Sequence, residues 1–150
     1  INATTINKKG DIILYSKNDL SFSYRKSSFS KDEILLEANF KILEGNKKDI
    51  IKRKTDVSNM RKSTQPLKYR SAGSIFKNPS NYAAGYLIDK AGLKGLRIGD
   101  AEISTKHANF IINHGKAKSK DIINLIEIIK NKVKEKFNID LELEIKLLGI

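Results

Sequence analysis

Cysteine is absent from this 150-residue chain, which excludes disulfides and thiolate metal sites. Its two histidines, His107 and His114, are too few for most metal cages, so we expect no metal site. No apolar run approaches the roughly 20 residues of a membrane-spanning helix, and residues 1–9 lack the apolar region of a secretory signal. These absences favour a cytoplasmic protein without a membrane partner.

Acidic residues are few relative to basic ones. The chain has 29 Lys and Arg against 17 Asp and Glu, a net charge of +12. This balance points to anionic partners such as nucleic acid or phosphorylated ligands. The lysines are scattered rather than gathered in one tract, so charge alone does not identify the partner. The length suits one domain or one domain plus a piece of another. The start at Ile1, without methionine, suggests a fragment of a longer protein.

Hydrophobic periodicity predicts an α+β fold with a small mixed sheet and two to three helices. The expected strands cover residues 11–16, 33–43, 108–115 and 139–149. The expected helices cover residues 46–64, 80–92 and 119–137. The remaining long segment, residues 65–79, is expected to be a loop.

The later elements carry the sharpest local signals. For the helix over 80–92, Ser80 or Asn81 is the expected cap; its expected inner face consists of Tyr82, Tyr86, Leu87 and Ala91. Ser119 is the expected cap of the helix over 119–137, whose apolar residues form one broad face. In residues 139–149 apolar and charged residues alternate, which predicts a strand with one buried face.

Three places have residues suited to chemistry. Tyr24-Arg25 lies in a polar loop, where an arginine can bind a carboxylate or phosphate; the alternative is a solvated surface arginine. In residues 71–79, "SAGSIFKNP", small residues permit a turn that presents Ser74, unless this is an ordinary helix-entry loop. Glu144 could tune proton transfer or simply face water. The glycine spacing of a phosphate-binding P-loop and the hydrolase pattern Gly-x-Ser-x-Gly are both absent.

Four segments together resemble one enzyme family in order and spacing. They are "YRKSSF", "QPLKYRSAGSIFKNP", "AGYLIDKAGLKGLRIGDAEISTKHANFIIN" and "LELEIKLLG". The chain is similar to the C-terminal half of the UDP-N-acetylenolpyruvoylglucosamine reductases, also called UDP-N-acetylmuramate dehydrogenases, in their shorter, second type. The resemblance implies an oxidoreductase of bacterial peptidoglycan synthesis. NADPH would reduce a bound FAD, which would then pass hydride to UDP-N-acetylglucosamine enolpyruvate.

The resemblance also implies roles for individual residues. Arg25 would hold the substrate carboxylate, Ser74 would donate the proton, and Glu144 would assist Arg25 in polarising the carboxylate. Further substrate-binding positions implied in the same way, some with a weaker match to the family, are Tyr24, Arg61, Lys62, Gln65, Lys77, Asn78 and Asn109.

The flavin-binding part of the family lies N-terminal to these segments, and residues 1–70 contain no glycine-rich phosphate loop. Residues 1–64 therefore resemble the tail of the flavin domain, 65–140 the substrate-binding domain and 141–150 a strand returning to the body. No FAD-binding residue can be named. The full-length form is expected to be a monomer, whereas the fragment is expected to expose an apolar face through which copies can associate. The alternative from another class is a basic nucleic-acid-binding module without catalytic activity.

Overall fold

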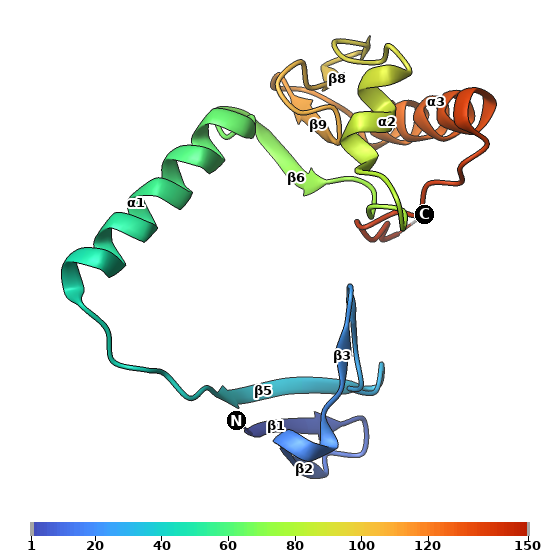
Figure 1. Cartoon of the computed structure of the whole chain (residues 1–150). Coiled ribbons are helices and arrows are strands. Elements are labelled where there is room, and N and C mark those ends of the chain that lie inside the picture. The colour runs from blue at the N-terminus through green and yellow to red at the C-terminus, as the bar shows by residue number, and fades with distance from the viewer. Residues whose placement is uncertain (1, 150) are drawn as a thin grey trace. The chain divides into compact units, whose positions relative to one another are not determined.

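The computed structural model describes residues 2–149, which form two compact units that divide between Ile50 and Ile51 (Figure 1). The helices lie between groups of strands along the chain, so the expected α+β class is confirmed. All strand pairs of the described residues are antiparallel, so the sheets are not mixed as expected. Among residues 2–149, no helix combines the length and apolar character that crossing a membrane requires.

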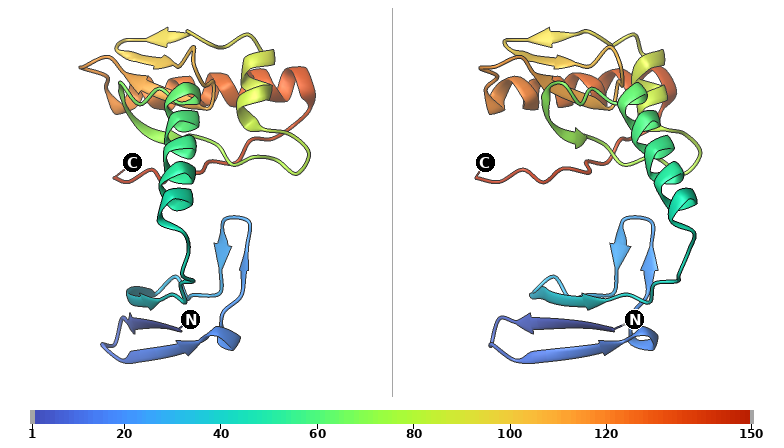
Figure 2. Two further views of the ribbon diagram at one scale, coloured as in Figure 1. Left: turned by 60° about the vertical axis from the view of Figure 1, so that its left-hand side comes forward. Right: turned by 90° about the vertical axis from the view of Figure 1, so that its left-hand side faces the viewer.

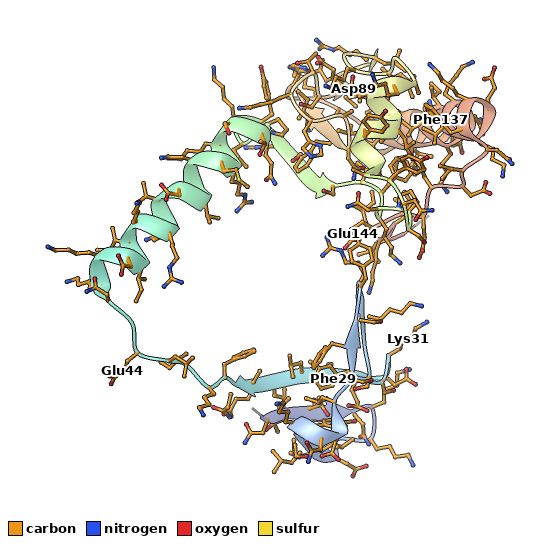
Figure 3. The ribbon with its side chains drawn as sticks, in the orientation of Figure 1. Phe29, Lys31, Glu44, Asp89, Phe137 and Glu144 are labelled. Atoms are coloured by element: carbon orange, nitrogen blue, oxygen red, sulfur yellow. The ribbon has the colours of Figure 1, made fainter. Side chains whose placement is uncertain are left out.

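The N-terminal unit is built on a three-stranded antiparallel sheet with the order β2-β1-β5. The strands are β1 (Asn2–Asn7), β2 (Ile12–Ser16) and β5 (Glu33–Asn39). Strand β1 was not predicted, because most residues of its sequence "NATTIN" are polar. Buried Thr5 donates a hydrogen bond to Glu33, which also accepts one from Tyr15. Phe29, labelled in Figure 3, packs edge-on against Tyr15 and completes this small cluster.

A short 3-10 turn, η1 (Lys17–Asp19), leads to a β-hairpin in the same unit. Its strands are β3 (Phe22–Ser23) and β4 (Lys26–Ser27), with Phe22 paired to Ser27. The two residues between the strands are Tyr24 and Arg25. The predicted polar loop is therefore the tip of a hairpin.

Helix α1 (Lys47–Thr64) matches the predicted helix over 46–64 within one residue. It ends shortly before Pro66, and the Gln65 N–H still donates to the Arg61 carbonyl. None of its side chains is buried, which agrees with its sparse apolar stripe.

The C-terminal unit has a four-stranded antiparallel sheet with the order β6-β9-β8-β7. The strands are β6 (Arg70–Ser74), β7 (Arg97–Ile98), β8 (Ala101–Ile103) and β9 (Phe110–Asn113). Helix α3 (Ser119–Phe137) runs along this sheet and contacts β7 and β8, while α2 (Ala84–Lys90) contacts α3 (Figure 2). The core between these elements contains Phe76, Leu87, Ile88, Ile103, Leu125, Ile129 and Val133.

The N-terminal cap positions of helices α2 (Ala84–Lys90) and α3 (Ser119–Phe137) differ from the predicted ones. Helix α3 covers the predicted residues, but Lys118 is its cap position, and the Lys118 N–H donates to the Asp121 carboxylate. Helix α2 begins after Ala83, so neither Ser80 nor Asn81 caps it. Its register buries Ala84, Leu87 and Ile88. Tyr82 and Tyr86 were expected on the inner face, but they are 50% and 52% exposed.

Two predictions around the sheet were wrong. Residues 65–79 were expected to be a loop, but they contain β6, whose small and polar residues gave no strand pattern. Residues 139–149 were expected to form a strand, but within the described chain they form only one isolated bridge, from Leu143 to Phe76. Leu141 is buried as the alternation predicted, whereas Leu147 is exposed.

Candidate active site

Ser74 is the last residue of β6, at the point where the strand leaves the sheet. The pairing of β6 with β9 shifts register between Ser71 and Ser74, and Gly73 in this bulge has a φ of +82°. A side chain is strained at that φ, so the glycine is required for the bulge. The predicted turn is therefore a bulged strand end that leaves Ser74 half-buried.

The segment that follows Ser74 is held on both sides by backbone hydrogen bonds. On one side the Ile75 N–H donates to the Asn109 carbonyl at 2.9 Å. On the other side the Glu144 N–H donates to the Ile75 carbonyl, and the Lys77 N–H donates to the Glu142 carbonyl, both at 2.8 Å. Ser74 and Glu144 therefore belong to adjoining backbone segments, although 70 positions separate them in the chain. Figure 3 labels Glu144 in the segment that follows α3.

The ammonium group of Lys77 forms an ion pair with the carboxylate of Glu142. The Lys77 side chain is 26% exposed and that of Glu142 is 73% exposed, so water screens this pair. The pair fixes the direction of the lysine beside the serine segment.

A cavity of about 310 Å³ opens beside Ser74. It is lined by residues of the serine segment, of α2 and of the loop before β9. Its basic residues are Lys94 and Lys106, and Asp89 of α2, labelled in Figure 3, is its acidic one. Ser74, Asn78 and Asn109, three of the predicted site residues, line this same cavity.

His107 contributes a neutral imidazole to the cavity wall. Burial lowers the pKa of His107 below its ordinary value, so the uncharged form is favoured. Its Nδ1 accepts the Asn109 N–H at 3.3 Å, and its ring packs edge-on against Phe110 with centroids 4.8 Å apart. Helix α2 approaches this ring so closely that a Cβ on Gly85 would lie 3.1 Å from the His107 Cε1 atom.

Asn78 ties the serine segment to the start of α2. Its Oδ1 accepts the Ala84 N–H at 3.0 Å, so this residue provides the hydrogen bond that Ser80 or Asn81 was expected to provide. Asn78 is exposed and lines the cavity, and its role in substrate binding stays a prediction.

Arg25 and Tyr24 form the hairpin tip of the N-terminal unit. The Arg25 Cζ atom lies 5.6 Å from the centroid of the Tyr24 ring, within the range of a cation–π contact. Arg25 has a φ of 58°, which is uncommon for a residue other than glycine. A positive φ of this kind is common in the two-residue turn of a β-hairpin. The approach of Arg25 to Ser74 and Glu144 stays a prediction.

Other predicted residues lie at the C-terminal end of α1 and just after it. The Arg61 Nε donates to the Gln65 Oε1 at 3.1 Å, and the Lys106 Nζ donates to the Lys62 carbonyl at 2.6 Å. Lys62 and Gln65 line a second cavity of about 380 Å³, of which Lys106 is also a wall residue. Lys62 and Gln65 therefore lie outside the cavity beside Ser74, and Lys106 is a wall residue of both cavities.

Sequence reasoning missed several residues that line the cavity beside Ser74. Gly85, Lys94, Lys106 and His107 were given no role in binding and entered only as parts of a longer motif. The pairing of a small residue at 85 with an aromatic ring at 107 has no signal in a single sequence. The run "KHAN" was the available hint, because it combines a cation, an imidazole and an amide before a strand.

Comparisons with known proteins agree on one family. The model of the UDP-N-acetylenolpyruvoylglucosamine reductase C-terminal domain matches residues 65–148. The reductase of that name from Clostridium novyi is 48% identical over 149 residues, 99% of this chain and 48% of that protein. The reductase from Fervidobacterium nodosum is 46% identical over 140 residues, 91% of this chain and 45% of that protein.

A solved structure agrees with these matches. The crystal structure of UDP-N-acetylenolpyruvylglucosamine reductase from Thermus caldophilus superposes with a TM-score of 0.82 at 41% identity. The match covers 97% of this chain and 51% of that one. The chain thus spans about half the length of the relatives it matches.

Proposed function

Because the chain belongs to the UDP-N-acetylenolpyruvoylglucosamine reductase family, we propose that it forms the substrate-binding and proton-donating part of such an enzyme. The reaction is the reduction of UDP-N-acetylglucosamine enolpyruvate to UDP-N-acetylmuramate. The observation that carries this proposal is the joining of Ser74 and Glu144 through one short backbone ladder, with a cavity beside Ser74.

The proposed reaction needs a flavin cofactor, and we assign none of the residues of this chain to its binding. FAD, once reduced by NADPH, would supply a hydride to the terminal alkene carbon. Residues 1–70 have only two glycines, Gly10 and Gly45, and these are far apart in sequence, so they do not fit a phosphate cradle for FAD. We therefore assign no FAD ligand and derive only what the residues of this chain do.

Negative charge develops on the substrate carboxylate and the carbon next to it when hydride adds to the alkene. Arg25 binds this carboxylate, and Glu144 orients and polarises the pair. Ser74 then gives its hydroxyl proton to the carbon. A serine is a weak acid, but an enolate carbon is a strong enough base when the loop fixes the direction of the hydroxyl.

The sugar diphosphate occupies the cavity beside Ser74 in this proposal. Asn78 and the imidazole of His107 line this cavity and offer hydrogen bonds to it, and Lys77 adds charge from the neighbouring serine segment. Tyr24 packs against the substrate from the hairpin tip, and Arg61, Lys62 and Gln65 add polar groups at the second cavity.

The test separates proton donation from flavin reduction in the protein that carries this chain. We expect Ser74→Ala to slow the reoxidation of reduced flavin by the enolpyruvyl substrate by a factor of about 10²–10⁴. Flavin reduction by NADPH should stay near the wild-type rate, since Ser74 takes no part in it. Stopped-flow absorbance at the flavin band measures both steps.

The matched control is Ser80→Ala, an exposed serine of the same segment, which should leave both rates unchanged. Equal losses in the two half-reactions of Ser74→Ala would contradict the proton-donor role. Failure of the wild-type protein to use the enolpyruvyl substrate would contradict the proposed function itself.

A further inference from the structure

We propose that Asn109 is a positioning residue for the proton donor. Its buried amide fixes the backbone just after Ser74 and thereby sets the direction of the serine hydroxyl. This inference rests on the proposed function, because it takes Ser74 as the proton donor.

The side-chain amide of Asn109 forms two hydrogen bonds with one residue. The Phe76 N–H donates to the Asn109 Oδ1 at 2.9 Å, and the Asn109 Nδ2 donates to the Phe76 carbonyl at 2.8 Å. Asn109 is 3% exposed and Phe76 is 1% exposed, so neither bond competes with water. The amide offers one donor and one acceptor to Phe76, as a paired residue of a neighbouring strand would.

This arrangement extends the sheet beyond the end of a strand. Strand β9 begins at Phe110, which pairs with Ser74, and the Asn109 carbonyl accepts the Ile75 N–H. The Asn109 side chain continues the pairing to the next residue, Phe76. Without it, two buried backbone groups would lose their partners, and each such loss costs about 1–3 kcal/mol.

The backbone of residues 75–77 is also hydrogen-bonded to the segment that contains Glu144. The Ile75 carbonyl accepts the Glu144 N–H, and the Lys77 N–H donates to the Glu142 carbonyl. The amide of Asn109 therefore acts on the backbone that connects Ser74 to Glu144. This gives Asn109 a role different from the substrate contact expected from the sequence.

The sharpest test replaces the amide by a carboxylate of the same shape. Asn109→Asp removes the donor to the Phe76 carbonyl and puts a negative oxygen against it. The matched control is Asn113→Asp at the other end of β9. Asn113 uses its Oδ1 to accept the Gly115 and Ala117 N–H groups at 2.7 and 3.1 Å, and a carboxylate can accept both.

In the protein that carries this chain, we expect Asn109→Asp to slow flavin reoxidation by the enolpyruvyl substrate about 10- to 100-fold, because small misplacements of a reacting group have effects of this size. Flavin reduction by NADPH should be unchanged, and reoxidation is compared at saturating substrate, so that any effect of the new charge on substrate binding does not enter the rate. The solvent deuterium isotope effect on reoxidation should rise, because proton transfer becomes the slow step. A purely structural role would lower thermal stability and leave this isotope effect unchanged.

Hydrogen exchange of the peptide over residues 70–79 provides a readout that does not depend on activity. The Ile75 and Phe76 amides should exchange faster in Asn109→Asp than in wild type or Asn113→Asp. Wild-type reoxidation rates or unchanged exchange in Asn109→Asp would overturn the inference. If Asn109→Asp does not fold, Asn109→Gln keeps both hydrogen-bonding groups on a longer arm, and wild-type turnover in it would overturn the positioning role.

The outcomes separate this inference from the proposed function. A wild-type protein that does not use the enolpyruvyl substrate contradicts the function. The exchange result then decides alone whether Asn109 fixes the segment.

Discussion

At the scale of single residues, the Asn78 side chain both caps a helix and lines the cavity beside Ser74. The Asn78 Oδ1 accepts the first free N–H of α2, and the same residue lines the cavity beside Ser74. Helix caps contribute about 0.5–2 kcal/mol to stability. A substitution at Asn78 can therefore be chosen to keep the cap and change only the charge at the cavity.

Asn78→Asp and Asn78→Ala should separate these two roles. We expect Asn78→Ala to lower the free energy of unfolding by about 1 kcal/mol, because the Ala84 N–H loses its partner. Asn78→Asp should retain the stability, since a carboxylate also accepts that N–H, but it should weaken UDP-N-acetylglucosamine binding about tenfold or more by repelling the diphosphate. Thermal unfolding and calorimetric titration measure the two effects.

Asn81→Ala is the control for this pair, because Asn81 was expected to cap α2 and does not. It should change stability by less than about 0.5 kcal/mol. Equal destabilisation by Asn78→Asp and Asn78→Ala would show that the hydrogen bond to Ala84 does not act as a cap.

The sequence predicted the candidate site unevenly at this scale. Ser74 and Asn78 were predicted from a short motif, and the structure places both at one cavity. The hydrogen bonds of Asn109 could not be predicted, because its partner lies 33 residues away and the amide replaces a backbone pairing. The bulge at Gly73 was predicted only as a tight turn, since a positive φ in a strand end has the same sequence signature as a turn.

At the scale of elements, prediction succeeded where local periodicity decides the structure. Helix α3 begins and ends at the predicted residues because its apolar face spans five turns. Strand β6 and the segment 139–149 depend instead on distant partners. The polar "RSAGS" of β6 pairs with β9, while the alternating segment finds only the bridge between Leu143 and Phe76.

Helix α2 shows how contacts between elements override helix propensity. Gly85 lies in its first turn, where alanine would favour the helix by up to about 1 kcal/mol. A Cβ there would lie 3.1 Å from His107 Cε1 and 3.6 Å from the Asn109 Cβ atom. The glycine therefore leaves room for the imidazole at the cavity wall.

We expect Gly85→Ala to leave stability nearly unchanged, because crowding of His107 offsets the gain in helix propensity. In a His107→Ala background, the same substitution should stabilise the protein by up to about 1 kcal/mol. A double-mutant cycle of thermal or urea unfolding measures this coupling. Additive effects of the two substitutions would show that the contact between Gly85 and His107 does not limit the helix.

At the scale of the whole molecule, the chain consists of two units with separate cores. The C-terminal unit has the large cluster around Phe76, Leu125 and Ile129, and residues 65–148 match a domain model. The N-terminal unit has a small sheet with many exposed apolar side chains, among them Ile12, Leu14, Ile34 and Leu36. We therefore expect the C-terminal unit to carry most of the stability of the chain.

This division predicts a separable binding function. A fragment of residues 45–150 contains α1, the four-stranded sheet and the cavity beside Ser74, but it lacks Tyr24 and Arg25. We expect it to fold cooperatively and to bind UDP-N-acetylglucosamine as the longer protein does. It should not gain affinity from the enolpyruvyl carboxylate, because the guanidinium proposed to bind that carboxylate is on the other unit.

Calorimetric titration with the two ligands, on the fragment and on the longer protein, measures this difference. The longer protein should prefer the enolpyruvyl ligand by about 1.5–3 kcal/mol, the range for hydrogen bonds to charged groups. Arg25→Ala in the longer protein should abolish the preference and leave UDP-N-acetylglucosamine binding intact. A fragment that keeps the full preference would show that the carboxylate is bound within residues 45–150, and the role proposed for Arg25 would then be wrong.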